Sequence, residues 1–403
     1  MTSRPFEPGK AAEPLPQDFS LVLGGPLFQL LRRAHLSDDT LHLAKQRILV
    51  ITGLAWLPLL VLSTLEGELL RGKAAVPFLM DVEVHVRFLV ALPLLIAAEL
   101  VVHQRMRPLL AVFLERHLIP PGEMERFKAA IASAQRLRNS VLAEVVLIIL
   151  VYGVGVLFLW RNYIALDTVT WYGSPSSEGG GLSLGGRWYG YVSLPIFQFL
   201  LMRWYFRFVV WIRFLWQVSR IRLSLIPTHP DGNGGLGFLR NAVYAFGLLA
   251  FAHGALLAGY LANRIFFLGA SLPQFKVEIA VMLIFMLCVI LVPLLVFAPQ
   301  LARTKRVGLR EYGTLAERYV RAFDTKWLRG GAPADEKLLG TSDLQSLADL
   351  EHSYGTLKTM RASLVTRESL IQVAVATLAP IVPLGLTMMP LEQLLKSLMS
   401  VLL

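Results

Sequence analysis

A succession of apolar runs, each close to the length that a bilayer requires, most constrains the fold of this chain. The clearest run is residues 48–65, ILVITGLAWLPLLVLSTL, which carries no charged side chain. A membrane-spanning helix needs about 20 predominantly apolar residues, because each residue advances about 1.5 Å along the helix axis. With 55% hydrophobic and 17% charged residues among 403, the chain is too apolar for a soluble protein of this size. We therefore predict an all-α fold, a polytopic helical bundle in a membrane.

Seven apolar runs define the predicted spans. They lie at about residues 48–65, 88–102, 140–160, 188–216, 241–263, 277–298 and 370–389. Pro380 and Pro383 interrupt the last run, so a re-entrant segment stays an alternative to a seventh crossing.

Four parts follow from these spans. The predicted parts are a cytoplasmic tail with interfacial helices (1–47), the transmembrane bundle (48–300), a small cytoplasmic helical insertion (301–368), and the last span with a C-terminal helix (369–403). That C-terminal helix is expected to lie on the membrane surface, because leucines from Leu391 onwards form one stripe of it.

The distribution of basic residues predicts the orientation of the bundle. They gather in the connection after the second span, around the turn before the fifth span and after the sixth span. Short cytoplasmic connections of membrane proteins are enriched in Lys and Arg, so we place the N-terminus and these three regions in the cytoplasm. The net charge of +11 is therefore explained by topology. We expect the lipid bilayer, and no nucleic acid, as a partner, because no nucleic-acid-binding module is recognisable.

Few residues have the spacing of a chemical centre. The single cysteine, Cys288, lies inside an apolar run, which excludes both a disulfide framework and a zinc cluster. His229, Asp231 and His352 are too scattered to predict a metal site, and no nucleophile motif is present. We expect no metal, no cofactor and no catalytic residues, and an enzyme is the least favoured class.

Charged residues inside the predicted spans carry the main functional signal. Arg203 and Arg207 stand four residues apart on one face of the fourth span. Charged groups at bilayer depth usually face a wet cavity or pair with one another. Glu99 in the second span and Glu144 in the third are the candidate partners. Three interpretations remain open: an arginine-lined pathway that favours anions, structural ion pairs, or arginines that extend to the membrane surface.

His253 in the fifth span is the one intramembrane group that we expect to titrate near neutral pH. Gly247, Gly254 and Gly259 lie on the same helix and predict close packing against another span. His253 is accordingly either a proton relay or a packed, hydrogen-bonded side chain.

A polar, glycine-rich hinge, residues 228–239, joins the fourth and fifth spans. Pro227 and Pro230 end the preceding helix, and the pairs Asp-Gly and Asn-Gly favour a tight turn. Its backbone N–H groups can form an anion-binding nest, its side chains can bind a cation, or it is a rigid turn between helices. A calcium loop is excluded because the closing Glu is missing, and a nucleotide fingerprint because no βαβ unit surrounds it. The candidate hinge residues are His229, Asp231, Asn233, Gly234 and Gly235.

An aromatic face is predicted on the helix that follows the sixth span. Its large side chains recur at helical spacing between residues 309 and 327. This face either docks a partner or packs against a neighbouring helix. The candidate docking residues are Tyr312, Tyr319, Phe323 and Trp327.

Three strings of the sequence resemble a family of multi-pass bacterial membrane proteins without an assigned activity. They are THPD with GGLGFL in residues 228–239, KWLRGGAP at 326–333 and LGTSDLQSLADL at 339–350. The resemblance covers most of the chain after the N-terminal tail. It implies a location in the bacterial inner membrane and assigns no functional residue.

Two functional hypotheses follow from these observations. The first is a channel or transporter for a small anionic solute, which would pass along the arginines of the fourth span. The alternative is a scaffold or signalling protein that docks a cytoplasmic protein partner through its helical insertion. A homo-oligomer is compatible with both.

Overall fold

The chain is helical throughout the residues that its computed structural model describes. These are residues 20–33, 43–70, 74, 76–155, 170–173, 182–333, 336, 338 and 342–388. No β-strand occurs within these ranges, and only isolated bridges link Val76, Thr170, Gly173 and Leu182. The predicted all-α class is confirmed.

The helices of the bundle follow one another as a series of long and short segments. In chain order they are α1 (Pro26–Arg33), α2 (Ala44–Leu65), α3 (Val82–His85), α4 (Leu92–Glu115), α5 (Met124–Arg138), α6 (Val141–Leu150), α7 (Leu184–Trp188), α8 (Leu194–Ser219), α9 (Asn241–Ala245), α10 (Gly247–Leu268), α11 (Lys276–Leu291), α12 (Ala298–Phe323), α13 (Ser342–Thr359) and α14 (Arg367–Leu378). Short segments with tighter or wider turns extend several of them, namely η1 (Phe78–Met80), η2 (Val86–Ala91), η3 (Pro121–Glu123), η6 (Tyr189–Ser193), η7 (Gly237–Arg240), η8 (Leu272–Phe275), η9 (Val292–Phe297), η10 (Asp324–Leu328) and η11 (Val382–Met388).

Four helical runs are long and apolar enough to cross a bilayer. They are Ala44–Leu65, Val82–Glu115, Gly237–Leu268 and Leu272–Leu328. Two bent pairs of helices raise the number to six when each counts as one span. Pro121–Arg138 and Val141–Gly155 meet at 44°, and Arg367–Leu378 and Val382–Met388 meet at 57°.

These helices indicate a membrane protein with four to six candidate spans in the described part, and the count of seven stays a prediction. The helix that contains the predicted fourth span, α8, is not among the four runs or the two pairs. It carries Arg203, Arg207 and Arg213 along its 26 residues. The bend within Arg367–Met388 leaves both a crossing and a re-entrant segment open for the last predicted span.

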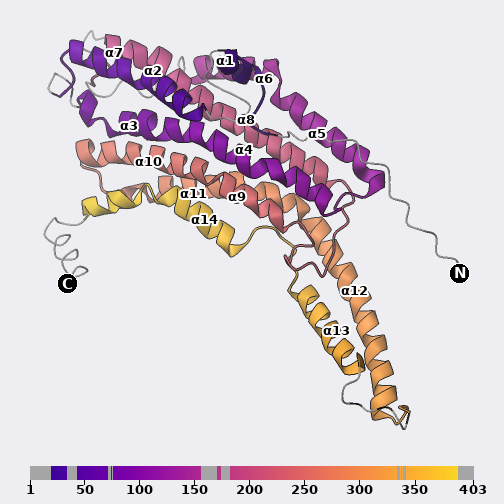
Figure 1. The fold of residues 1–403 in the computed structure, drawn as a ribbon. Helices are drawn as coiled ribbons and strands as arrows, with labels where there is room; N and C mark the ends of the chain where they lie inside the picture. The colour runs from indigo at the N-terminus through magenta and orange to yellow at the C-terminus, as the bar shows by residue number, and fades with distance from the viewer. Residues whose placement is uncertain are drawn as a thin grey trace.

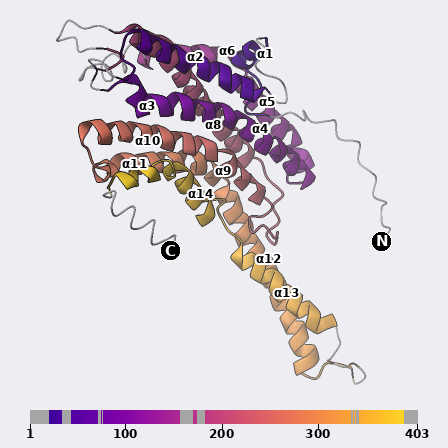
Figure 2. The same ribbon diagram turned by 60° about the vertical axis from the view of Figure 1, so that its left-hand side comes forward.

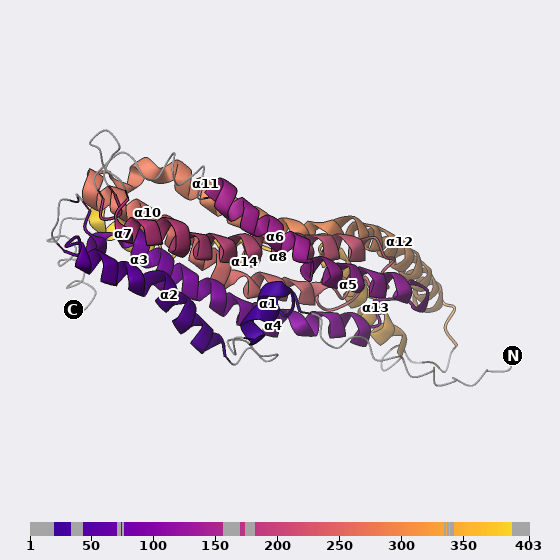
Figure 3. The same ribbon diagram turned by 90° about the horizontal axis from the view of Figure 1, so that it is seen from above.

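The long helices of the bundle run side by side, with α4 at the centre (Figure 1). Helix α4 packs against α2, α8, α9 and α10, and α14 packs against α10 and α11. Figure 3, which looks down from above, shows α6 and α8 on the side of α4 opposite α2. Aromatic side chains such as Phe88, Phe113 and Trp204 fill the core. Helix α2 exposes Leu54, Leu57 and Val61, as expected of a face that contacts lipid.

A helical hairpin projects from one end of the bundle. Helix α12 continues from α11 and η9 without a break, leaves the bundle, and has α13 packed back along it (Figures 1 and 2). We name α12, η10 and α13 the hairpin arm. With 26 residues, α12 alone is about 39 Å long. Apart from its first three residues, 298–300, the arm falls within the predicted insertion 301–368, whose cytoplasmic location stays a prediction.

Two predicted spans turn out to be parts of longer helices. The second, 88–102, lies within Val82–Glu115, because the helix continues beyond it with buried residues such as Met106 and Phe113. The sixth, 277–298, continues into α12, and Pro293 only tightens the helix at η9. Residues 1–19, residues 34–42 and the predicted C-terminal helix from Leu391 lie outside the described residues.

Candidate functional site

Five charged side chains from four helices meet inside the bundle. They are Arg47 of α2, Glu99 of α4, Glu144 of α6, and Arg203 and Arg207 of α8, and we name them the buried charge cluster. Each is at most 8% exposed. The spacing of four residues along α8 is what turns both of its arginines towards the same neighbours.

Glu99 lies at the centre of the cluster. Nη2 of Arg207 donates to Oε1 of Glu99 at 2.7 Å, and Arg47 donates to Oε2. Nη1 of Arg203 lies 3.6 Å from Oε1 of Glu99, and its Nε lies 3.6 Å from Oε1 of Glu144. The structure thus brings together four of the five residues that the sequence singled out for the pathway or its ion pairs, and adds Arg47. The fifth, His253, lies apart from the cluster's ion pairs and contacts Tyr205 and Leu249.

The chain segment of residues 20–25 lies over the cluster. The guanidinium of Arg138 donates to the carbonyl oxygen of Ser20, and Nδ1 of His103 lies 2.9 Å from the Ser20 hydroxyl. Nη2 of Arg203 lies 3.4 Å from the carbonyl oxygen of Gly24. Gly24 has a φ of 131°, a backbone conformation that other residues rarely adopt, and a Cβ there would also displace the side chain of Asn139. We name residues 20–25 the covering segment.

Beyond the cluster, the interior of the bundle is apolar. Phe88, Leu92 and Leu95 of the run that includes α4, and Phe197 of α8, are almost fully buried. Nε1 of Trp204 donates to the carbonyl oxygen of Leu95 at 2.9 Å, which holds α8 against α4. In this arrangement the arginines of the cluster pair with its two carboxylates, and these apolar side chains lie beyond them.

A second polar group lies at the other end of α4's helical run. Asp81 accepts hydrogen bonds from Nε1 of Trp171 at 2.9 Å and from Nδ2 of Asn263 at 2.8 Å. Arg87 donates to Glu83 and to the hydroxyl of Tyr189. Sequence reasoning missed Arg47 and the charged members of this group, because each lies just before a predicted span, where polar residues are ordinary.

Both ring nitrogens of His253 have partners. Nδ1 lies 2.7 Å from the carbonyl oxygen of Leu249, and Nε2 lies 2.8 Å from the hydroxyl of Tyr205. Because a carbonyl oxygen only accepts, Nδ1 carries the proton, and Nε2 accepts from the tyrosine in the neutral ring. These contacts are those of a packed, hydrogen-bonded histidine, and its role in proton transfer stays a hypothesis.

The hinge is organised around the carboxylate of Asp231. Oδ1 accepts from the backbone N–H groups of Asn233 at 2.8 Å and Gly235 at 3.1 Å, and Oδ2 accepts from that of Gly237 at 2.8 Å. Nδ1 of His229 lies 3.0 Å from Oδ1. The nest of N–H groups that the sequence predicts is therefore filled by the chain's own carboxylate.

The hinge also holds the base of the hairpin arm. The carbonyl oxygen of Gly232 accepts from the backbone N–H of Arg361 at 2.8 Å, and Nδ2 of Asn233 donates to the carbonyl oxygen of Ser363 at 3.0 Å. Gly232 has a φ of 65°, a conformation that glycine adopts readily and that other residues rarely adopt. Gly234 has similar backbone geometry and packs on Met360. The third interpretation, a rigid turn between helices, fits these contacts.

Electrostatics at Asp231 gives the hinge a predicted pH dependence. Partial burial on its own would raise the pKa of Asp231, but hydrogen bonds from Asn233, Gly237 and Gly235 more than offset it and lower that pKa. A carboxyl whose pKa is lowered by folding stabilises the fold above its unfolded value, about 4. This contribution is lost as the pH falls from about 4 through the lower folded-state value.

We expect Asp231→Ala to lower the stability of the hinge by about 2 kcal/mol, because it leaves three backbone N–H groups without their acceptor. Trypsin should then cut at Arg361 faster than in the unsubstituted protein at neutral pH. The difference in unfolding temperature between the two proteins, measured from neutral pH downwards, should shrink below about pH 4. Asp349→Ala, which removes an exposed carboxylate of α13, is the control. Equal cleavage of both variants would contradict the role of Asp231.

The predicted aromatic face lies between the two helices of the arm. The hydroxyl of Tyr319 donates to the carbonyl oxygen of Asp343 at 2.8 Å, and Nε1 of Trp327 donates to its carboxylate at 3.1 Å. Lys326 pairs with the same carboxylate at 2.8 Å, and this hydrogen bond raises the pKa of Lys326. Phe323 and Tyr312 are half-buried on this helix. The packing alternative accounts for these contacts, and docking through these residues stays a hypothesis.

The chain was compared with family models, curated proteins and solved structures. No family model, no curated protein and no solved structure matches it. The resemblance of its three strings to a bacterial membrane family is therefore not supported by a family model. Within the described residues, no group of three or more His, Cys, Asp or Glu side chains is placed to hold a metal ion.

Proposed function

We propose that this protein is a membrane-anchored docking protein whose hairpin arm receives a protein partner on the cytoplasmic side. The observation that carries the proposal is the arm itself: a helical hairpin that leaves the bundle and is held at its base by the hinge. A rigid, projecting element presents a surface at little conformational cost on binding. The basic residues around its base favour the cytoplasmic side.

The surface of α12 is complementary to an acidic partner. Arg306, Arg310 and Arg318 are exposed, and none of them forms an ion pair with another described residue. Leu315, 52% exposed, lies between Arg310 and Arg318 along the helix and supplies an apolar contact. Unpaired arginines beside an apolar side chain are typical of protein interfaces. The proposed docking surface is therefore the outer face of α12 and not the aromatic side chains between α12 and α13.

Photo-crosslinking in cells tests this proposal. A photoreactive residue at the exposed position Thr314 should give one defined adduct, joined to an acidic segment of the partner. Charge reversal of the surface, Arg310→Glu with Arg318→Glu, should reduce that adduct about tenfold or more. The matched control, Arg187→Glu with Lys276→Glu, reverses two exposed charges at the far end of the bundle and should leave it unchanged. Absence of an adduct, or equal loss in both variants, would remove the proposal.

A second candidate function, movement of a small anion, has one specific observation in its favour. The buried charge cluster and Arg138 together contain four guanidinium groups and two carboxylates. Among the described residues this leaves an excess of two positive charges in a largely buried region, which an anion would offset. Movement requires the covering segment to shift and the apolar interior to open.

Anion efflux from proteoliposomes tests the second candidate. We expect Arg203→Gln to slow efflux of chloride or nitrate, while Arg213→Gln, an exposed arginine of the same helix, leaves the rate unchanged. Thermal unfolding of both variants separates an effect on transport from an effect on folding. Efflux no faster than from protein-free liposomes would discard this candidate.

A further inference from the structure

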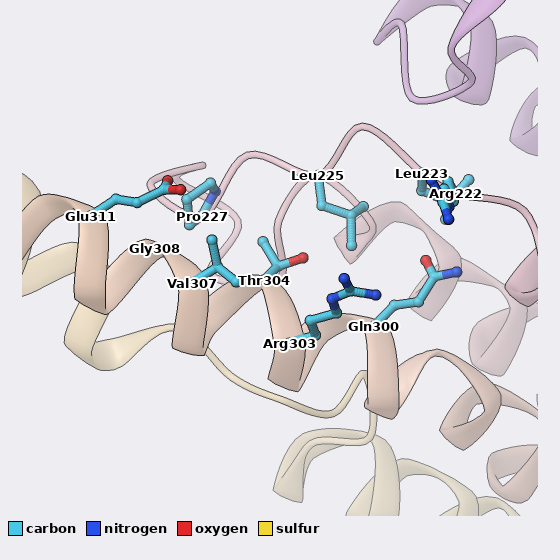
Figure 4. Close-up of a pocket in the computed structure, with 10 residues that line it drawn as sticks. All are labelled: Arg222, Leu223, Leu225, Pro227, Gln300, Arg303, Thr304, Val307, Gly308 and Glu311. Carbon is cyan, nitrogen blue, oxygen red and sulfur yellow. The ribbon is translucent and has the colours of Figure 1, made fainter. Parts of the chain in front are cut away.

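A pocket of about 480 Å³ lies at the base of the hairpin arm, outside the buried charge cluster. Figure 4 shows that one wall is the start of α12 and the other is the chain that leaves α8 towards the hinge. Its volume is within the range of small-molecule sites, about 300–1,000 Å³. The α12 wall belongs to the helical run Leu272–Leu328. The pocket lies beside the part of this run that follows its apolar residues.

Two arginines face this pocket from opposite walls. Arg303 comes from α12, and Arg222 comes from the chain just after α8 (Figure 4). Both are exposed, and in the part of the chain that the structure describes neither forms an ion pair or a hydrogen bond. Two guanidinium groups across a small pocket are the arrangement that binds a phosphate group.

Apolar side chains line the same pocket. Leu223 and Leu225 lie on the wall after α8, and Val307 lies on α12, one turn beyond Arg303. Glu311 lines the end of the pocket farthest from Arg222 in Figure 4. It lies eight residues from Arg303, which is about 12 Å along the helix. The positive charge is therefore concentrated at one end, and the apolar side chains lie beside it.

The pocket walls are held in place by Gln300. Its Nε2 donates to the carbonyl oxygens of Ser219 and Ile221, both at 2.6 Å. Ser219 is the last residue of α8, where helices leave acceptors without partners inside the helix, and Ile221 lies two residues beyond it. The start of α12 and the end of α8 are thus joined, which fixes the backbone segments that carry the two arginines relative to each other.

Surrounding side chains resemble those that anchor a protein at a membrane surface. Trp216 of α8 is 50% exposed, and the guanidinium of Arg220 stacks over its ring at 5.2 Å. Val292 and Leu295 of η9 are also exposed, in the helical run that leads to Arg303. Tryptophan and arginine beside exposed apolar residues are typical of the headgroup level of a bilayer.

We propose that this pocket binds the phosphate of an anionic phospholipid headgroup, with Arg222 and Arg303 on the phosphate and the apolar side chains beside the start of the acyl chains. The chemistry shared with a soluble phosphate is the anion itself. The exposed apolar surface next to the pocket favours the lipid. The proposal does not depend on a docking partner or on anion movement.

Native mass spectrometry of the full-length protein, titrated with phosphatidylglycerol or phosphatidylcholine in one detergent, tests the proposal. We expect tighter binding of phosphatidylglycerol, and about tenfold or more weaker binding of it after Arg222→Gln with Arg303→Gln. Phosphatidylcholine should bind both proteins alike. Val307→Asp, which places a carboxylate on the pocket wall, should weaken phosphatidylglycerol binding in the same direction. Because all three substituted residues are exposed, the variants are expected to unfold at the wild-type temperature without lipid.

Arg306→Gln with Arg318→Gln is the matched control, since it removes two exposed arginines of α12 that do not line the pocket. This variant should bind phosphatidylglycerol like the wild type. Equal loss in this control, or equal affinity of the wild type for the two lipids, would overturn the proposal. Displacement of phosphatidylglycerol by millimolar inorganic phosphate through the same arginines would also overturn it and identify a soluble phosphate as the ligand.

Discussion

Replacement of Glu99 by Gln is expected to lower the free energy of unfolding by about 3–5 kcal/mol, which is the usual cost of removing one partner of a buried ion pair. Glu99 is 4% exposed and is the shared partner of Arg47, Arg203 and Arg207. When Glu99 loses its charge, Glu144 is the one carboxylate that remains in the cluster. The loss should appear as a lower unfolding temperature of the detergent-solubilised full-length protein.

The control for this prediction is Glu115→Gln, which removes an exposed carboxylate at the end of the same helix. It should leave the unfolding temperature within experimental error, as most surface substitutions do. A second variant, Glu99→Gln with Arg207→Gln, should recover part of the loss, because one unpaired buried charge is removed with its partner. If Glu99→Gln unfolds like the wild type, the cluster is not the structural contact that its geometry indicates.

Replacement of Gly254 by Leu is expected to destabilise the protein by about 3 kcal/mol or more. This is at or above the upper end of the destabilisation usually caused by overpacking a core. A Cβ at Gly254 would lie 1.9 Å from the carbonyl oxygen of Thr377 in α14. Because the obstructing atoms are backbone, a side-chain rotation cannot relieve the contact, and α14 would have to move away from α10. The unfolding temperature measures the effect, as for Glu99.

Gly247→Leu provides the matched control on the same helix. Apart from its chain neighbours and the backbone of its own helix, no described atom lies within 4 Å of a Cβ at Gly247, so the backbone clash of Gly254 is absent there. Leucine also favours a helix over glycine by several tenths of a kcal/mol, and the control should be neutral or slightly stabilising. Equal effects at the two positions would show that α10 and α14 do not pack as closely as the structure has them.

The sequence alone predicted the properties that depend on neighbours along the chain. Long apolar runs predicted a helical membrane protein, since a bilayer allows few other folds for such runs. The Asp-Gly and Asn-Gly pairs around Asp231 predicted a tight turn, and three of its glycines have positive φ angles. The spacing of Tyr319 and Trp327 predicted a helix with one aromatic face. Whether that face was internal or free depended on α13, which follows later in the chain.

The tertiary structure alone decided which charges meet. The sequence named Glu99 as a candidate partner of Arg207, but the two are 108 residues apart, and no local pattern could show that they meet. It offered no partner for Arg47, which is 52 residues from Glu99. The same holds for Asn233 and Ser363, which join the hinge to the arm across 130 residues. Local composition determines which segments become helices, because each helix satisfies its own backbone hydrogen bonds. The partner of a buried charge depends on how those helices pack, and only the folded chain brings such residues within contact distance.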